Sequence, residues 1–150
     1  MVYVLNIDGQ PLMPTDRHGK VRHLLKDGRA EVVKCCPFTI RLLYDSTHYT
    51  QDIVLGVDAG SKHIGLSGTT ETKELYASDV ELRNDIVDLI STRRQNRRFR
   101  RNRKTRYRKA RFLNRLSDKK DWLAPSIRQK VDTHMTVVSR VCKILPVTKI

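Results

Sequence analysis

Residues 54–68 read VLGVDAGSKHIGLSG, and their pattern is the strongest indication of the fold in this sequence. The residues before Asp58 are apolar or glycine, and a second run of β-forming residues follows from Ile64. Gly60 and Gly65 allow a tight chain reversal where a side chain would crowd the backbone. The stretch therefore predicts a hairpin of two strands joined by a glycine-rich turn, with Asp58 near the end of the first strand.

The position of Asp58 indicates a chemical role for its carboxylate. We expect the first strand to be buried on both faces, because its apolar run is nearly continuous. A buried carboxylate is costly unless a metal ion or a basic group compensates it. Mg²⁺ is the metal that we expect, because it takes carboxylate oxygens and keeps water ligands for a phosphate substrate. Two such ions could act on a scissile phosphate if other segments supply further carboxylates.

Strand-Asp-x-Gly is a weak motif by itself, and two other interpretations stay open. Asp58 can simply stabilise its own turn. The glycines can instead bind phosphate, as in sugar kinases and actin-like ATPases, which open with a similar strand. Lys62 and His63 lie in the same turn and are expected to be exposed turn residues rather than phosphate-binding or catalytic groups.

Strand signals continue on both sides of this hairpin. Residues 73–82 predict a third strand, and residues 1–50 predict a small βαββ unit whose helix is capped at Thr15 and stopped at Gly28. The prolines in IDGQPLMP keep the segment before that helix extended. Fifty residues bury little core, so this unit is expected to pack on the rest of the chain.

The positive charge of the chain is concentrated in one segment. The 150 residues include 30 Lys and Arg against 16 Asp and Glu, a formal net charge of +14. Residues 93–115 contain 13 of these cations and no acid, so the rest of the chain has 17 against 16, a net of +1. Such a block predicts a localised polyanionic partner rather than a generally basic surface.

This basic block predicts a helix that becomes stable when phosphate groups bind to it. The helix is expected to begin near Asn84 and to continue through residue 116, with Phe99 and Phe112 docked on the protein. Repulsion between like charges three and four residues apart amounts to about 3–7 kcal/mol at low salt, so the free helix should fray. Arginine outnumbers lysine 11 to 2 in the block, and its guanidinium fork suits bidentate phosphate contacts.

The last part of the chain predicts a helix and the start of a strand. A helix from Pro125 or Ser126 to about Lys143 is expected, and VTKI at 147–150 has the composition of a strand. The apolar face expected for the helix comprises Ile127, Val131, Met135 or His134, Val138, and Val141 or Cys142.

The remaining features indicate an intracellular protein. Three cysteines without a CxxC pair argue against a disulfide framework and a zinc knuckle. The N-terminal residues lack the features of a signal peptide, and no apolar run approaches the ~18 residues of a membrane span. We expect a soluble cytoplasmic protein with no membrane partner.

Three motifs, in this order, resemble one known family. PLMP (Pro11–Pro14), LGVDAGSKHIGLS (55–67) and RRFRR (Arg97–Arg101) resemble IscB and its HNH-less relative IsrB, the transposon-encoded RNA-guided nucleases. The second motif looks like the first RuvC motif, and the third fits the RRxRR signature of a bridge helix. The resemblance covers essentially the whole chain.

The resemblance implies an α/β fold: a partial ribonuclease-H-like RuvC core, a small N-terminal α+β PLMP domain and a long arginine-rich bridge helix. It divides the chain into a PLMP domain (1–50), RuvC-like segment I (51–83), the bridge helix (84–116) and the start of RuvC-like segment II (117–150).

The resemblance also implies a function, that of a prokaryotic Mg²⁺-dependent DNA endonuclease guided by an ωRNA to its target DNA. Asp58 would be the first catalytic and metal-binding carboxylate of the RuvC site. The residues expected to bind guide RNA are Arg93, Arg94, Arg97, Arg98, Arg100, Arg101, Arg103, Lys104, Arg106, Arg108, Lys109 and Arg111.

The chain departs from the family pattern at its C-terminal end. LPVTKI stops before the strand expected to carry the second RuvC glutamate, and Asp79, Glu81 and Asp85 are not obvious substitutes. The third RuvC acid, the HNH domain and the C-terminal target-motif domain are missing too. We therefore expect an N-terminal portion that is inactive unless the rest of the nuclease is supplied. The alternative is a non-catalytic protein that binds structured RNA and keeps Asp58 as a relic.

Overall fold

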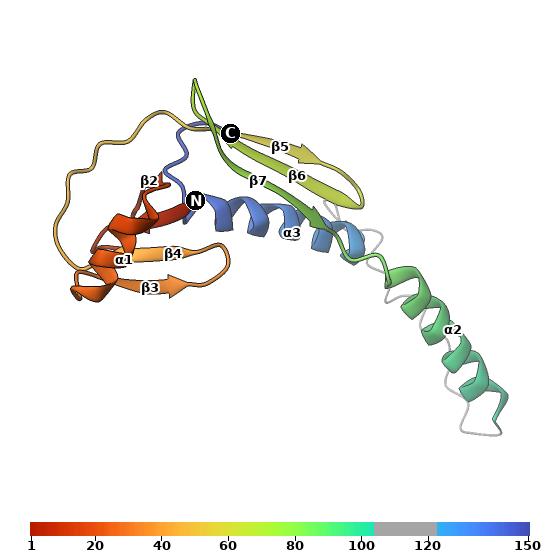
Figure 1. Cartoon of the computed structure of the whole chain (residues 1–150). Coiled ribbons are helices and arrows are strands. Elements are labelled where there is room, and N and C mark those ends of the chain that lie inside the picture. Colours follow the sequence, from red (N-terminus) through yellow and green to blue (C-terminus); the bar gives the residue numbers. More distant parts are fainter. Residues whose placement is uncertain (104–122) are drawn as a thin grey trace.

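The computed structural model of the chain describes residues 1–103 and 123–150. Within these residues the chain forms two β-sheets and three helices, so it is a mixed α/β protein. Figure 1 shows α1 lying on the N-terminal sheet, α3 running along the second sheet, and α2 extending away from both. None of the described helices is both long enough and apolar enough to span a bilayer.

The N-terminal sheet has four strands in the order β2-β1-β4-β3. They are β1 (Val2–Leu5), β2 (Pro11–Thr15), β3 (Ala30–Lys34) and β4 (Thr39–Leu42). β1 and β4 are parallel, whereas β1–β2 and β3–β4 are antiparallel. β3 ends before Pro37, and β4 begins after it.

The extended segment before the helix is a full strand, so this unit is ββαββ and the βαββ prediction is wrong. β2 pairs with β1 and lies at an edge of the sheet. Proline lacks the N–H that a central strand needs but is tolerated at an edge. Pro11 and Pro14 therefore exclude helix without excluding β pairing.

α1 (His18–Lys26) follows β2 and packs on this sheet through Val21. Thr15 does not cap the helix, because its hydroxyl accepts the N–H of Arg17, 3.2 Å away, before the helix begins. The stop predicted at Gly28 is confirmed: this glycine has a φ of 66°, and its N–H and that of the next residue bond to carbonyls of the last helical turn.

The second sheet is an antiparallel meander of β5 (Val54–Ala59), β6 (His63–Thr69) and β7 (Glu74–Glu81). The predicted hairpin and third strand are therefore confirmed. Gly60 is required in the turn, because a Cβ built there would overlap the carbonyl oxygen of His63. Local turn chemistry thus determines where Asp58 comes to lie.

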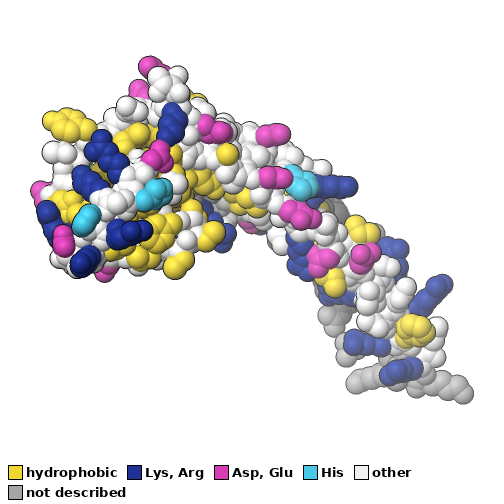
Figure 2. All heavy atoms as spheres, in the orientation of Figure 1, with side chains coloured by type: hydrophobic (Ala, Val, Ile, Leu, Met, Phe, Trp, Pro, Cys, Tyr) yellow, Lys and Arg dark blue, Asp and Glu magenta, His cyan; other side chains and the backbone are white. Residues whose placement is uncertain are grey.

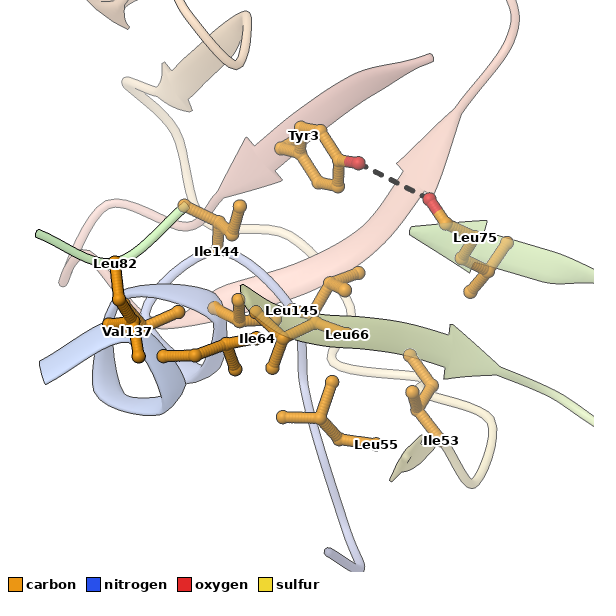
Figure 3. Close-up of a cluster of buried hydrophobic side chains, with 11 residues drawn as sticks. Tyr3, Ile53, Leu55, Ile64, Leu66, Leu75, Leu82, Val137, Ile144 and Leu145 are labelled. Atoms are coloured by element: carbon orange, nitrogen blue, oxygen red, sulfur yellow. Dashed lines mark hydrogen bonds between the residues drawn. The ribbon is translucent and has the colours of Figure 1, made fainter. Parts of the chain in front are cut away.

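The main core lies between the second sheet and α3 (Pro125–Cys142), whose start at Pro125 was predicted. Figure 3 shows side chains of the sheet meeting those of α3 and of the residues that follow it. The fully or nearly fully buried side chains of this core include Ile53, Leu55, Ile64, Leu66, Val137, Val141, Ile144 and Leu145.

The apolar face predicted for α3 is only partly right. Val141 is buried and Val138 is packed against the core, but Ile127, Val131 and Met135 are 51%, 52% and 62% exposed. The residue that packs deepest on the sheet along with Val141 is Val137. The helix therefore contacts the core only through its C-terminal half.

The N-terminal unit packs on the second sheet, as predicted. The Tyr3 hydroxyl donates to the Leu75 carbonyl, 3.2 Å away (Figure 3), and its ring lies edge-on to Tyr76 with centroids 6.2 Å apart. Burial raises the pKa of Tyr3. An ion pair between Asp16 and Lys73 also joins the two units, and its hydrogen bond lowers the pKa of Asp16.

The C-terminal residues pair with the free side of β5. Lys149 forms a parallel bridge with Val54, and its carbonyl accepts the N–H of Leu55 at 2.9 Å. The N–H of Thr148 in turn donates to the carbonyl of Ile53 at 3.0 Å. VTKI therefore contributes an isolated bridge that runs parallel to β5, and it is not a strand within the described residues.

Candidate functional site

The face of the second sheet that points away from α3 is open. Asp58 pairs with Gly65, and Gly65 pairs with Asp79, so these three residues form one row across the strands. The neighbouring row consists of small residues, namely Gly56, Ser67 and Ala77. Both rows line an open concavity of about 710 Å³. The face therefore combines carboxylates with a shallow floor that an extended chain can approach closely.

Asp58 is exposed, and the prediction that β5 is buried on both faces is wrong. β5 buries Leu55 and half-buries Val57 on the α3 side, whereas Val54 is 46% exposed and Gly56 has no side chain to bury. The apolar run is thus covered on one face only. Because the Asp58 carboxylate is exposed to water, its charge does not require a cation to compensate for burial.

The Asp58 side chain has no hydrogen-bond or ion-pair partner among residues 1–103 and 123–150. The Asp58 carboxylate therefore does not stabilise the turn that follows it. The hydrogen bond in that turn is made by the backbone, where the Gly60 N–H donates to the Asp58 carbonyl oxygen at 3.2 Å. Asp79, in contrast, lies 3.2 Å from Nδ1 of His63. His63 is exposed as predicted, but its pairing with Asp79 depends on the β6–β7 register, which the sequence pattern does not reveal.

The described residues contain no group of three or more His, Cys, Asp or Glu side chains placed to hold a metal ion. Asp58 and Asp79 share one face with a single strand between them, which puts their Cα atoms about 10 Å apart. Mg²⁺ is commonly held by one or two carboxylates together with waters and substrate phosphates. Asp58 therefore fits as part of a Mg²⁺ site rather than as a complete one.

The arginine-rich helix is α2 (Ile86–Asn102), which begins close to the predicted Asn84. Arg103 has an extended backbone, with a ψ of 140°, so the helix does not run uninterrupted through residue 116 as predicted. Five of the predicted RNA-binding residues lie outside the described residues: Lys104, Arg106, Arg108, Lys109 and Arg111.

The six arginines within α2 occupy one half of its circumference. Arg93, Arg97 and Arg100 follow the i, i+4, i+7 spacing of a single row along a helix, and Arg94, Arg98 and Arg101 form a second row beside it. Asp88, Gln95 and Phe99 lie on the opposite side. The helix therefore carries two parallel rows of guanidinium groups on one side.

None of the residues of α2 is buried. Phe99 is 65% exposed, so the prediction that it docks on the protein is wrong. Asp85 at the start of the helix pairs with Arg83, whose hydrogen bond lowers the pKa of Asp85. Most helices in proteins are stabilised by the packing of a buried face, and α2 buries no residue.

The charges of the described residues are unevenly distributed. Figure 2 shows acidic side chains over the second sheet and the start of α2, Lys and Arg side chains along the rest of α2, and side chains of both signs on the N-terminal unit. No carboxylate among residues 1–103 and 123–150 pairs with Arg93, Arg94, Arg97, Arg98 or Arg101. A phosphate backbone is therefore attracted to α2 and repelled by the open sheet face unless cations are bound there.

Comparison with known proteins adds one finding. No match was found among curated proteins. The model of a family described as RRXRR protein matches residues 2–150, which include both sheets and all three described helices. The match spans nearly the whole chain, and the chain therefore belongs to the RRXRR protein family.

Proposed function

We propose that the chain is the guide-RNA-binding portion of an IscB/IsrB-type RNA-guided DNA endonuclease, and that it supplies the first metal-binding carboxylate of the RuvC-type site. Membership of the RRXRR family is consistent with a nuclease-associated domain of this type. The observation that carries the proposal is the pair of arginine rows on one exposed face of α2.

The two rows suit a nucleic-acid backbone better than base edges. Guanidinium groups bind phosphates through paired N–H donors, and residues four apart in a row are separated by about 6 Å along the helix. Each row can follow its own stretch of phosphates, so α2 lies between two backbone segments of a folded RNA. In such a nuclease base pairing reads the target, while the protein binds shape and backbone.

The proposed division of the chain follows the motifs: a PLMP domain at 1–50, RuvC-like segment I at 51–83, an arginine-rich bridge segment at 84–116 that contains α2, and the start of RuvC-like segment II at 117–150. The course of the chain after α3 supports the partial ribonuclease-H-like core. Thr148 and Lys149 pair with β5 on the side opposite β6, which is where a further strand would join the sheet.

Asp58 is proposed to hold Mg²⁺ at the open face of this sheet. When bound, the ion activates water and stabilises charge on a scissile phosphate. Gly56 and Gly65 let a phosphodiester backbone approach without meeting side chains, and Asp79 repels that backbone until cations are present. Further carboxylates must join Asp58 before cleavage, so this chain alone binds RNA and does not cut.

The partners that follow from this proposal are an ωRNA guide, a target DNA and the remaining segments of the nuclease, in the cytoplasm of a prokaryotic cell. A second candidate function is a non-catalytic protein that binds structured RNA. It is favoured by one observation, the lack of a group of three metal-binding side chains within the described residues.

The affinity of the chain for structured RNA is expected to fall steeply with salt, because each bound phosphate releases counterions. If about half of the cations in residues 93–115 meet phosphates, a plot of log affinity against log salt has a slope of about −4 to −6. Fluorescence anisotropy of a labelled hairpin RNA, titrated at several KCl concentrations, measures it. A slope shallower than about −2 would contradict the proposal.

A further inference from the structure

We infer a second RNA contact, a pocket in the N-terminal unit that takes one unpaired nucleotide. The inference rests on the proposed RNA-binding function and deepens it. The pocket lies where the start of α1 meets β2, the end of β4 and the segment that leads from β4 to β5. Figure 1 shows that segment running around the outside of the N-terminal sheet. The cavity has a volume of about 420 Å³.

The floor of this pocket is apolar, and its rim carries an unusually exposed aromatic ring. Leu12 and Leu42 in the floor are 8% and 6% exposed, whereas Tyr49 on the rim is 87% exposed. Because most of the Tyr49 ring is exposed to solvent, it gives up little packing against the protein when it stacks on a ligand. Proteins that bind unpaired RNA commonly stack bases on such rings, because every base has a flat π face.

A second tyrosine in the pocket is already held in place. The Arg29 guanidinium lies 4.4 Å from the centroid of the Tyr44 ring, in a cation–π arrangement. Tyr44 is half-buried and packs against the small core of the N-terminal unit. It therefore forms a fixed wall, and Tyr49 is the ring available to close on a base.

The polar groups of the pocket complement a nucleotide. Ser46 Oγ is buried and has no hydrogen-bond partner among the described residues. A buried hydroxyl is costly when unpaired, and a base edge or a ribose 2′-OH would satisfy it. Lys20 supplies a cation at the rim. This combination fits a base, a sugar and a phosphate together.

The test uses the full chain and a short single-stranded RNA that contains one 2-aminopurine, whose fluorescence is quenched when it stacks. The unsubstituted chain is expected to bind and to quench. Tyr49→Ala and Tyr49→Leu should lose most of the quenching and bind the oligonucleotide about 10-fold more weakly. Tyr49→Phe keeps the ring and should behave like the unsubstituted chain. Because Tyr49 is so exposed, none of these changes should affect folding.

The variants separate the pocket from the rest of the RNA surface. If the chain binds RNA but Tyr49→Ala and Tyr49→Leu quench as well as the unsubstituted chain does, the pocket assignment is wrong and the role proposed for α2 stands. If Tyr49→Phe loses quenching to the same extent as Tyr49→Ala, stacking on this ring is ruled out. If the unsubstituted chain binds no RNA at all, the proposed function fails as well. Quenching by the pocket with an equivalent DNA oligonucleotide, at equal affinity, would overturn its assignment to RNA.

Discussion

Replacement of Arg97, Arg98, Arg100 and Arg101 with Gln is expected to weaken the binding of structured RNA by on the order of 100-fold at about 0.1 M salt. The same change should make the log–log salt slope shallower by about 3, since each cation lost removes close to one unit. Gln is a good helix former, and no residue of α2 is buried, so the fold should be unaffected. Anisotropy titrations of a labelled hairpin RNA measure both quantities.

The matched control removes the same charge from elsewhere on the surface. Four exposed cations are available on α3 and after it: Arg128, Arg140, Lys143 and Lys149. Their replacement with Gln lowers the net charge equally and should change RNA affinity less than about threefold, because exposed charges more than about 10 Å from a phosphate are screened. Equal losses in the two variants would show that net charge, and not α2, governs binding.

Asp58→Ala is expected to abolish the nicking of one DNA strand in a nuclease that joins this chain to the remaining RuvC segments. Loss of a metal-binding carboxylate removes several kcal/mol of transition-state stabilisation, which corresponds to a rate at least about 100-fold lower. RNA affinity should not change, because Asp58 lies on the sheet and the arginine rows lie on α2. Conversion of supercoiled plasmid to its nicked form measures the rate.

Asp79→Ala provides the control for this experiment. Asp79 lies in the same row across Gly65 and is also exposed, but it is paired with His63. Its loss should lower nicking less than about fivefold, because it is not assigned to the metal. Undiminished nicking by Asp58→Ala would remove Asp58 from the site. It would also favour the alternative of a non-catalytic RNA-binding protein.

The features that depend on neighbouring residues are predictable from the sequence. The hairpin around Gly60, the stop at Gly28 and the start of α3 at Pro125 each depend on the backbone preferences of one or two residues. The concentration of arginine in α2 is visible in composition alone. Each of these predictions gives the position of an element or a charge along the chain, but not which other segments pack against it.

The features that depend on packing between distant segments are not predictable in this way. The apolar run of β5 would be the same whether one face or two were covered, so the exposure of Asp58 follows only from the position of α3. The face predicted for α3 included Ile127 and Val131, whereas the side chains that the sheet buries are Val137 and Val141. The row of Asp58, Gly65 and Asp79 requires a register across three strands.

Other differences between the predicted and the observed elements arise where a residue pattern is compatible with more than one local structure. Pro11 and Pro14 disfavour helix but are compatible with an edge strand, so β2 was predicted only as an extended segment. No glycine or proline marks the end of α2 at Asn102. Repulsion among neighbouring arginines is sufficient to make α2 shorter than the helix propensity of its residues predicts.

Hydrogen exchange of the α2 amides is the sharpest test of whether RNA phosphates bind to the arginine face of α2. In the free chain, amides 90–102 are expected to exchange rapidly, because no residue of α2 is buried and its cations repel one another. Addition of structured RNA should slow their exchange by at least about tenfold, while the core amides of β5 and β6 stay as they were. Strong protection of α2 before RNA is added, or no change in α2 when RNA is bound, would contradict the account.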